Sequence, residues 1–137
     1  MKHLDLTSFA NTLHSLDIAL HEPGDTLNEV KLQMMQDSVI QRFEYTYELA
    51  WKTIKRHLEM QQETPLDDLG RRDLFRRAFE AQLIQDPEAW FGYQDARNKT
   101  AHAYDHKIAL DVYRSIDPFL KDAKALLQTL EKKYGGS

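Results

Sequence analysis

The chain has 137 residues, a length typical of one domain with a single hydrophobic core. Hydrophobic residues make up 42% of it and charged residues 29%, a balance that excludes an intrinsically disordered protein. The net charge of −4 argues against a protein held to nucleic acid mainly by bulk electrostatics, and the lack of cysteine excludes disulfides and thiolate zinc sites.

The N-terminal segment is interrupted by Asp5 and Asp17, so it lacks the continuous apolar stretch of a signal peptide. No apolar run approaches the roughly 18 residues that a membrane-spanning helix needs. We therefore expect a cytoplasmic protein with no membrane partner. The five glycines and four prolines fall mostly at the boundaries of periodic stretches, which predicts long helices joined by short loops.

Apolar residues at three- and four-residue spacing predict a first amphipathic helix from about Leu6 to His21. Its core-facing residues are Leu6, Phe9, Leu13, Leu16 and Leu20. The Glu-Pro-Gly sequence at 22–24 stops this helix, and a loop through Asp25 is expected to follow.

A second, long helix is predicted from about Leu27 to Gln61, where the chain has neither glycine nor proline. One apolar stripe runs along it: Leu32, Met35, Val39, Phe43, Tyr47, Ala50, Ile54 and Leu58. Trp51 is also assigned to the core, whereas Tyr45 lies off the stripe. At about 1.5 Å per residue the helix would span about 50 Å, so we expect a bend or an overhanging end.

Three further helices are expected. One runs from about Leu69 to Ile84, with apolar residues inward and arginines outward. Asp86 and Pro87 are start signals for a fourth helix, and Asp105 or His106 begins a last one. The inward residues of the third helix are Leu74, Phe75, Ala78, Leu83 and Ile84, and the outward arginines are Arg71, Arg72, Arg76 and Arg77.

The last helix contains Asp117 and Pro118, a second start signal at which we expect a kink or break. From Tyr134 the chain is expected to fray, so residues 134–137 form a disordered tail. The whole pattern predicts one all-α domain over residues 1–137, an antiparallel up-and-down bundle of four to five helices.

The stretch RNKTAHAY, residues 97–104, concentrates the chemistry of the chain. On a continuous helix Arg97 and Tyr104 would project within roughly 20° of each other, whereas His102 would point roughly 140° away from Arg97. To converge on one ligand, these side chains need either a helix that ends near Thr100 or a second copy of the chain across a two-fold axis.

These residue types suit cleavage of a phosphodiester without a metal. A histidine near neutral pH can accept the proton of a ribose 2′-hydroxyl or donate one to the leaving oxygen, which gives His102 an acid–base role. The planar guanidinium of Arg97 can bind the phosphate oxygens. Asn98 and Lys99 add a neutral donor and a cation, and Tyr104 can bind phosphate or stack on a base.

The spacing alone favours a structural interpretation. Arg97 would then pair with Asp95 or another neighbouring acid, His102 would cap a helix end and Tyr104 would pack. His102 and His106 are one turn apart, but no third ligand is evident and we expect no metal site.

Three segments together resemble HEPN domains, in particular the HepT or nucleotidyltransferase-substrate-binding branch. DARNKTAHAYD matches the R-x4-H-x-Y signature of these domains. DSVIQRFEYTYELAWKTIKRHL, residues 37–58, resembles the long second helix of this branch, and LFRRAFEAQLIQDPEAWFGYQDARN resembles the approach to the motif. The likeness covers about residues 32–114.

The resemblance implies a homodimer in which the motifs of both subunits line a cleft. It also implies a metal-independent endoribonuclease with Arg97 and His102 as catalytic residues and Asn98 as the polar residue after the arginine. Such proteins are toxins of type VII-like toxin–antitoxin pairs. Their partner is a small MntA-like nucleotidyltransferase, which in related pairs transfers AMP from ATP to the motif tyrosine, here Tyr104. The chain itself then needs no cofactor.

Two alternatives remain open. The chain could bind a nucleotide or substrate for a nucleotidyltransferase without cutting RNA, or it could be a helical adaptor with structural Arg97 and His102. The four arginines of the third helix could contact RNA or an acidic partner, or form a solvated face. From the second helix, the candidates to line the cleft are Asp37, Arg42, Glu44 and Glu48.

Overall fold

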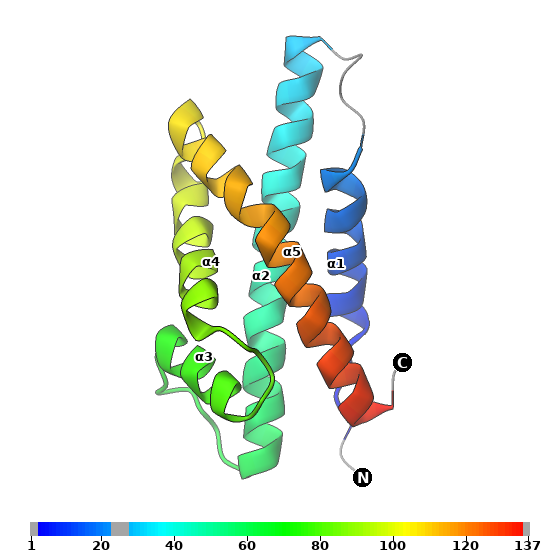
Figure 1. Ribbon diagram of the computed structural model, residues 1–137, viewed down its shortest axis with the longest axis vertical. Coiled ribbons are helices and arrows are strands. Elements are labelled where there is room, and N and C mark those ends of the chain that lie inside the picture. The colour runs from blue at the N-terminus through cyan, green and yellow to red at the C-terminus, as the bar shows by residue number, and fades with distance from the viewer. Residues whose placement is uncertain (1–2, 23–27, 136–137) are drawn as a thin grey trace.

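A computed structural model describes residues 3–22 and 28–135, and these residues form a helical bundle without strands (Figure 1). Its elements are α1 (Thr7–Leu20), α2 (Glu29–Gln62), α3 (Arg71–Glu80), α4 (Pro87–Lys99), the short 3-10 helix η1 (Thr100–His102) and α5 (His106–Tyr134). The all-α prediction is confirmed. The expected loop through Asp25 lies outside the described residues.

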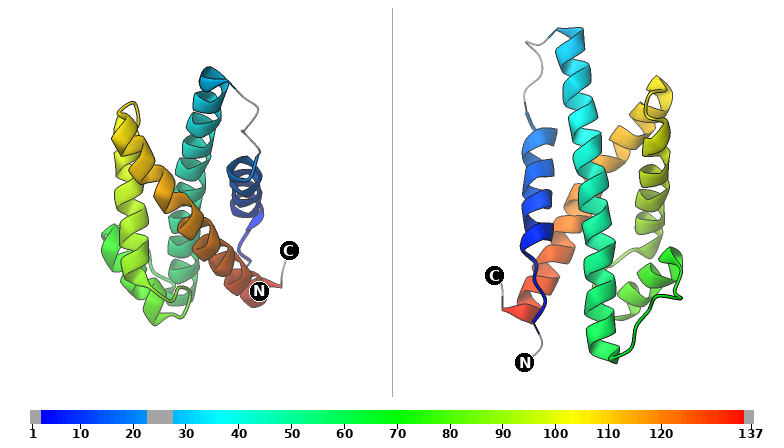
Figure 2. Two further views of the ribbon diagram at one scale, coloured as in Figure 1. Left: turned by 45° about the horizontal axis from the view of Figure 1, so that its top comes forward. Right: turned by 180° about the vertical axis from the view of Figure 1, so that it is seen from behind.

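Neighbouring long helices run antiparallel, and α5 crosses the others obliquely (Figures 1 and 2). It packs against α1, α2 and α4, so it ties the two halves of the bundle together. No helix among the described residues combines the length and the apolar character needed to cross a lipid bilayer.

A cluster of aromatic rings fills the centre of the bundle. Phe119 of α5 lies edge-on to Phe43 of α2 at 5.1 Å between ring centroids, and to Trp90 of α4 at 5.8 Å. All three rings are buried, and such edge-to-face contacts add to the free energy gained from burial. The hydroxyl of Tyr93 donates a hydrogen bond to Asp122, which satisfies the polar end of another buried ring. This core fixes α4 between α2 and α5.

The N-terminal end of α2 overhangs the bundle, as its predicted length implied. Val30, Leu32 and Met34 are 70%, 40% and 64% exposed, whereas the stripe from Val39 onward is buried. Leu32 was expected in the core and is not covered, because α1 does not extend along this part of α2 (Figure 1). Trp51 is also only partly buried.

Helix α3 ends at Glu80, four residues earlier than predicted. Gln82 adopts a left-handed conformation with φ of 65°, the amide of Leu83 donates to the carbonyl of Ala78, and the amide of Gln82 donates to that of Phe79. This is a Schellman ending, a motif in which glycine usually takes the left-handed position. Leu83 and Ile84 are still buried, but in the connection to α4.

Helix α5 is longer and more regular than predicted. It continues through Pro118 without a break, because Phe119 and Leu120 on its next turn are buried in the core. Tyr134 belongs to its last turn, whereas the sequence suggested the start of a frayed tail. The rest of that tail, beyond Gly135, lies outside the described residues.

A partly buried polar pair joins the C-terminal ends of α2 and α5. The Nδ1 atom of His57 on α2 lies 2.5 Å from the hydroxyl of Tyr134 on α5, and His57 is 1% exposed. Its Nε2 atom is buried without a hydrogen-bond partner among the described residues. Burial and the nearby charge of Lys133 lower the pKa of His57 from its usual 6.5.

This pair predicts how the free energy of unfolding depends on pH. Because the pKa of His57 is lower in the folded state, the unfolded state binds the proton more readily, and stability should fall as the pH drops below about 6.5. Urea denaturation at several pH values measures this slope. His57→Gln should flatten it between neutral pH and about 5, whereas replacement of the exposed His14 by Gln should not. An unchanged slope in His57→Gln would contradict the prediction.

Candidate functional site

The motif begins where α4 ends. The hydroxyl of Thr100 donates to the carbonyl of Arg97 at 2.6 Å and accepts from Nη1 of the same arginine at 3.4 Å. The chain then turns through η1, and Asp105 caps α5 by accepting from the amides of Lys107 and Ile108. A helix end near Thr100, one of the two arrangements considered for the motif, is therefore observed, and the predicted start of the last helix at Asp105 or His106 is confirmed.

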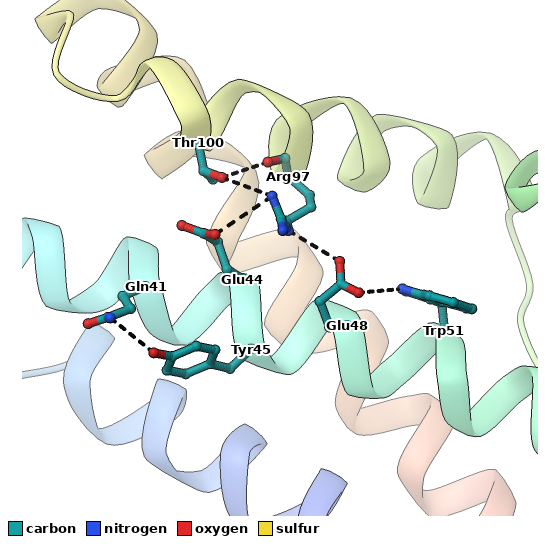
Figure 3. A network of polar contacts seen from close by, with 7 residues as sticks. All are labelled: Gln41, Glu44, Tyr45, Glu48, Trp51, Arg97 and Thr100. Carbon is teal, nitrogen blue, oxygen red and sulfur yellow. Dashed lines mark hydrogen bonds and ion pairs between the residues drawn. The ribbon is translucent and has the colours of Figure 1, made fainter.

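Arg97 points from α4 toward α2, where two carboxylates meet its guanidinium (Figure 3). Its Nη1 lies 3.6 Å from Oε2 of Glu44, and its Nε lies 3.3 Å from Oε1 of Glu48. The three side chains are between 31% and 32% exposed. Glu44 and Glu48 are four residues apart, so α2 presents both on one face.

The Nε atom of Arg97 is buried, and its contact with Glu48 falls short of a well-aligned hydrogen bond. Charge attraction, rather than a directional bond, therefore holds this edge of the guanidinium. Nη2 makes no hydrogen bond to the residues that the structure describes and is not among the buried unpartnered atoms. Nη2 of Arg97 is therefore not fully enclosed. Hydrogen bonds at an active site that are long or poorly aligned in the absence of a ligand often tighten when the ligand binds.

His102 and Tyr104 lie on the turn after α4 and face solvent. His102 is exposed, Tyr104 is 87% exposed, and their rings meet edge to face at 6.1 Å between centroids. Asn98 and Lys99 are exposed as well. Within one chain Arg97 contacts α2, whereas His102 contacts Tyr104. No hydrogen bond between Arg97 and His102 is present among the described residues.

A groove of about 630 Å³ lies between α2 and the motif turn. It runs along the N-terminal half of α2 and is closed on one side by the motif turn; Asp37, Glu44 and Tyr104 are among its lining residues. A smaller hollow of about 80 Å³ on the other side of Tyr104 is bordered by His106 and Tyr113 of α5. Tyr104 therefore stands between two concave surfaces.

The candidates from α2 separate into two groups. Asp37 and Glu44 line the groove, whereas Glu48 contacts Arg97 and is not part of the groove's lining. Arg42 does neither: it donates hydrogen bonds to Ser15 of α1 and to Ser38, and it lines a hollow between α1 and α2. It lies on the α1 side because it is two residues from Glu44, which is more than half a turn of helix.

The structure agrees only in part with the interpretation that the motif residues have purely structural roles. Arg97 does pair with acids, but with Glu44 and Glu48 of α2 rather than with Asp95. Tyr104 does not pack, since 87% of it is exposed. An exposed tyrosine beside an exposed histidine contributes little to stability.

The arginines of α3 are neither a free cationic ridge nor a simple solvated face. Arg71 stacks on the ring of Trp51 at 3.7 Å, and Arg72 and Arg76 lie over Phe91 at 4.8 and 5.2 Å. Arg76 also pairs with Asp73 at 2.8 Å. Most of this charge therefore covers aromatic rings.

Sequence reasoning missed the partners of Arg97. Thr100 was treated only as a position where the helix could end, and the pairing of Arg97 with Glu48 was not foreseen. The available signal was the spacing: Thr100 follows Arg97 by three residues, and Trp51 follows Glu48 by three, so each pair shares a helix face.

Comparisons with known proteins identify the family and the fold. The family model described as nucleotidyltransferase substrate binding protein like matches residues 4–132. A protein named probable ribonuclease HepT from Haemophilus influenzae is 38% identical over 136 residues, which cover 88% of this chain and 92% of that protein.

Two solved structures share the fold. A Haemophilus influenzae protein, described as having the fold of a substrate-binding domain of a nucleotidyltransferase, aligns with a TM-score of 0.88 and 31% identity, covering 93% of this chain and 99% of its own. A protein from Thermus thermophilus aligns with a TM-score of 0.75 and 24% identity over 89% of this chain and 98% of its own, which shows the fold alone. From the family match and the related sequence, this chain belongs to the family of nucleotidyltransferase substrate-binding proteins.

Proposed function

We propose that this protein is a HepT-like, metal-independent endoribonuclease that acts as a homodimer. The observation that carries the proposal is the state of Arg97: two carboxylates of α2 face its guanidinium, and one of them, Glu44, also lines the groove that Tyr104 borders. The relative named probable ribonuclease HepT supports the same reaction class. Exposed His102 is available to a substrate or to a second subunit.

The proposed reaction needs no group beyond the side chains of the motif. The ribose 2′-oxygen attacks the adjacent phosphorus, the P–O5′ bond breaks, and the products are a 2′,3′-cyclic phosphate and a free 5′-hydroxyl. His102 removes the proton of the 2′-hydroxyl or returns one to the 5′-oxygen, and Arg97 stabilises the charge on the phosphate oxygens.

We place the Arg97 of one subunit opposite the His102 of the other. In one chain Arg97 is directed toward α2, whereas His102 lies on the outward turn after α4. A two-fold axis beside this turn would bring each histidine to the arginine of the other copy. The exposed apolar side chains of the α2 overhang, Val30, Leu32 and Met34, provide a surface for such a contact.

Regulation is proposed to act through Tyr104. A nucleotidyltransferase partner, the antitoxin of the pair, would transfer AMP from ATP to its hydroxyl, forming a phosphodiester and releasing pyrophosphate. The 87% exposure of Tyr104 makes the hydroxyl accessible to such an enzyme. The added phosphate and nucleoside would occupy the groove next to Arg97 and compete with RNA.

Removal of His102 should abolish cleavage. The purified protein should cut single-stranded RNA in EDTA, and His102→Ala should lower kcat by about 10²- to 10⁴-fold, the usual contribution of general acid–base catalysis. The exposed His14 on α1 is the matched control, and His14→Ala should retain full activity. Equal rates for His102→Ala and the wild type would remove this residue from the mechanism. Tight nucleotide binding with intact RNA would instead favour the non-catalytic, substrate-binding alternative.

Replacement of Tyr104 should abolish the modification. With the partner nucleotidyltransferase and ATP labelled on the α-phosphate, the wild type should gain label, and Tyr104→Phe should gain none. Tyr45 on α2 is 55% exposed and serves as the control, because Tyr45→Phe should be labelled normally. Persistent labelling of Tyr104→Phe at the wild-type level would place the modification elsewhere.

A further inference from the structure

A chain of contacts leads from α3 through α2 to Arg97, and Trp51 lies at its centre. We propose that Trp51 is a positioning residue for Arg97, acting through Glu48, and that Arg71 holds the Trp51 ring in place. The proposal rests on the proposed function, because it assigns Trp51 a role in the binding of the scissile phosphate.

Glu48 connects Trp51 to Arg97, because both of its carboxylate oxygens have partners (Figure 3). Oε1 faces Nε of Arg97 at 3.3 Å, and Oε2 accepts a hydrogen bond from the indole Nε1 of Trp51 at 3.0 Å. The terminal torsion of a glutamate side chain is broad and weakly restrained by itself. The indole bond therefore determines which way the carboxylate of Glu48 faces.

Glu44 shows what the indole bond adds. Its carboxylate contacts Arg97 at the longer distance of 3.6 Å, and it has no hydrogen bond to a second side chain among the described residues. Partly exposed ion pairs of this kind contribute little to stability and, without a second hydrogen bond to the carboxylate, orient the side chains only weakly. Glu48, rather than Glu44, is thus the anchor of the guanidinium.

The indole is itself held by α3. The guanidinium carbon of Arg71 lies 3.7 Å from the centroid of the Trp51 ring, and Nη1 of Arg71 donates to the hydroxyl of Tyr47 at 3.1 Å. Tyr47 is fully buried, so Arg71 is anchored to the core of the bundle. A cation over a tryptophan face is attracted to the π-electrons of the ring and restricts its tilt. Trp51 is therefore fixed between the core and Glu48.

The consequence is an orientation for Arg97. With Nε facing Glu48 and Nη1 facing Thr100 and Glu44, the plane of the guanidinium is determined. A misplacement of about 1 Å in a group that binds the transition state can cost about 10²-fold in rate. A tryptophan that never contacts RNA can thus affect kcat.

The test removes the indole N–H and keeps an aromatic ring. Trp51→Phe should lower kcat roughly tenfold with a smaller change in KM, because Arg97 still binds phosphate but in less productive orientations. In a Glu48→Gln background, Trp51→Phe should cause no further loss of kcat, because the neutral glutamine has already removed the ion pair between residue 48 and Arg97. Arg72→Met is the matched control for Arg71→Met: Arg72 stacks on Phe91 and not on Trp51, so only Arg71→Met should lower kcat.

A readout independent of activity distinguishes this proposal from the proposed function. The NMR signal of the Arg97 Nε–H should shift and exchange faster with water in Trp51→Phe and Arg71→Met, and stay unchanged in Arg72→Met. If the wild-type protein does not cut RNA, the proposed function is wrong. The NMR signal of the Arg97 Nε–H then tests by itself whether Trp51 orients Arg97. An unchanged signal in Trp51→Phe, or full kcat for that variant in an active enzyme, overturns the proposal.

Discussion

The pairing of Arg97 with the carboxylates of α2 is the constraint on which the site depends. Ion pairs that are about one-third exposed add little to the free energy of unfolding, so their main effect here is orientation. They direct the cation of Arg97 from α4 toward α2 instead of leaving it free on the surface. The aromatic core keeps α4 and α2 at the separation that this contact needs, because Trp90 and Phe43 both pack on Phe119.

The motif therefore combines one restrained residue with two that face solvent. Arg97 is held from three sides, whereas His102 and Tyr104 project outward from a short turn. A restrained arginine suits the recognition of a phosphate, and an exposed tyrosine suits modification by another enzyme. The exposed overhang of α2 lies on the same groove as Tyr104, since Gln33 and Met34 belong to its lining. A single surface would thus serve the second subunit, the substrate and the partner.

Sequence patterns predicted the helices well where periodicity and capping residues agreed. Asp86 and Asp105, both predicted as start signals, cap α4 and α5 by side-chain hydrogen bonds. The errors have tertiary causes: Gln82 takes a left-handed conformation usually given to glycine, and core packing carries α5 through Pro118. The motif residues were found from their types, but the contacts of Arg97 with Glu48 and of Trp51 with Arg71 join different helices, which periodicity cannot reveal.

The central claim is that an arginine and a histidine from two subunits meet at one phosphate. The most direct test is a heterodimer of Arg97→Ala and His102→Ala protomers, co-expressed with different tags and purified through both. If the site is shared, one intact pair is restored, and this heterodimer should show about half of the wild-type activity although each homodimer is inactive. A heterodimer as inactive as the two parent variants would contradict the shared site.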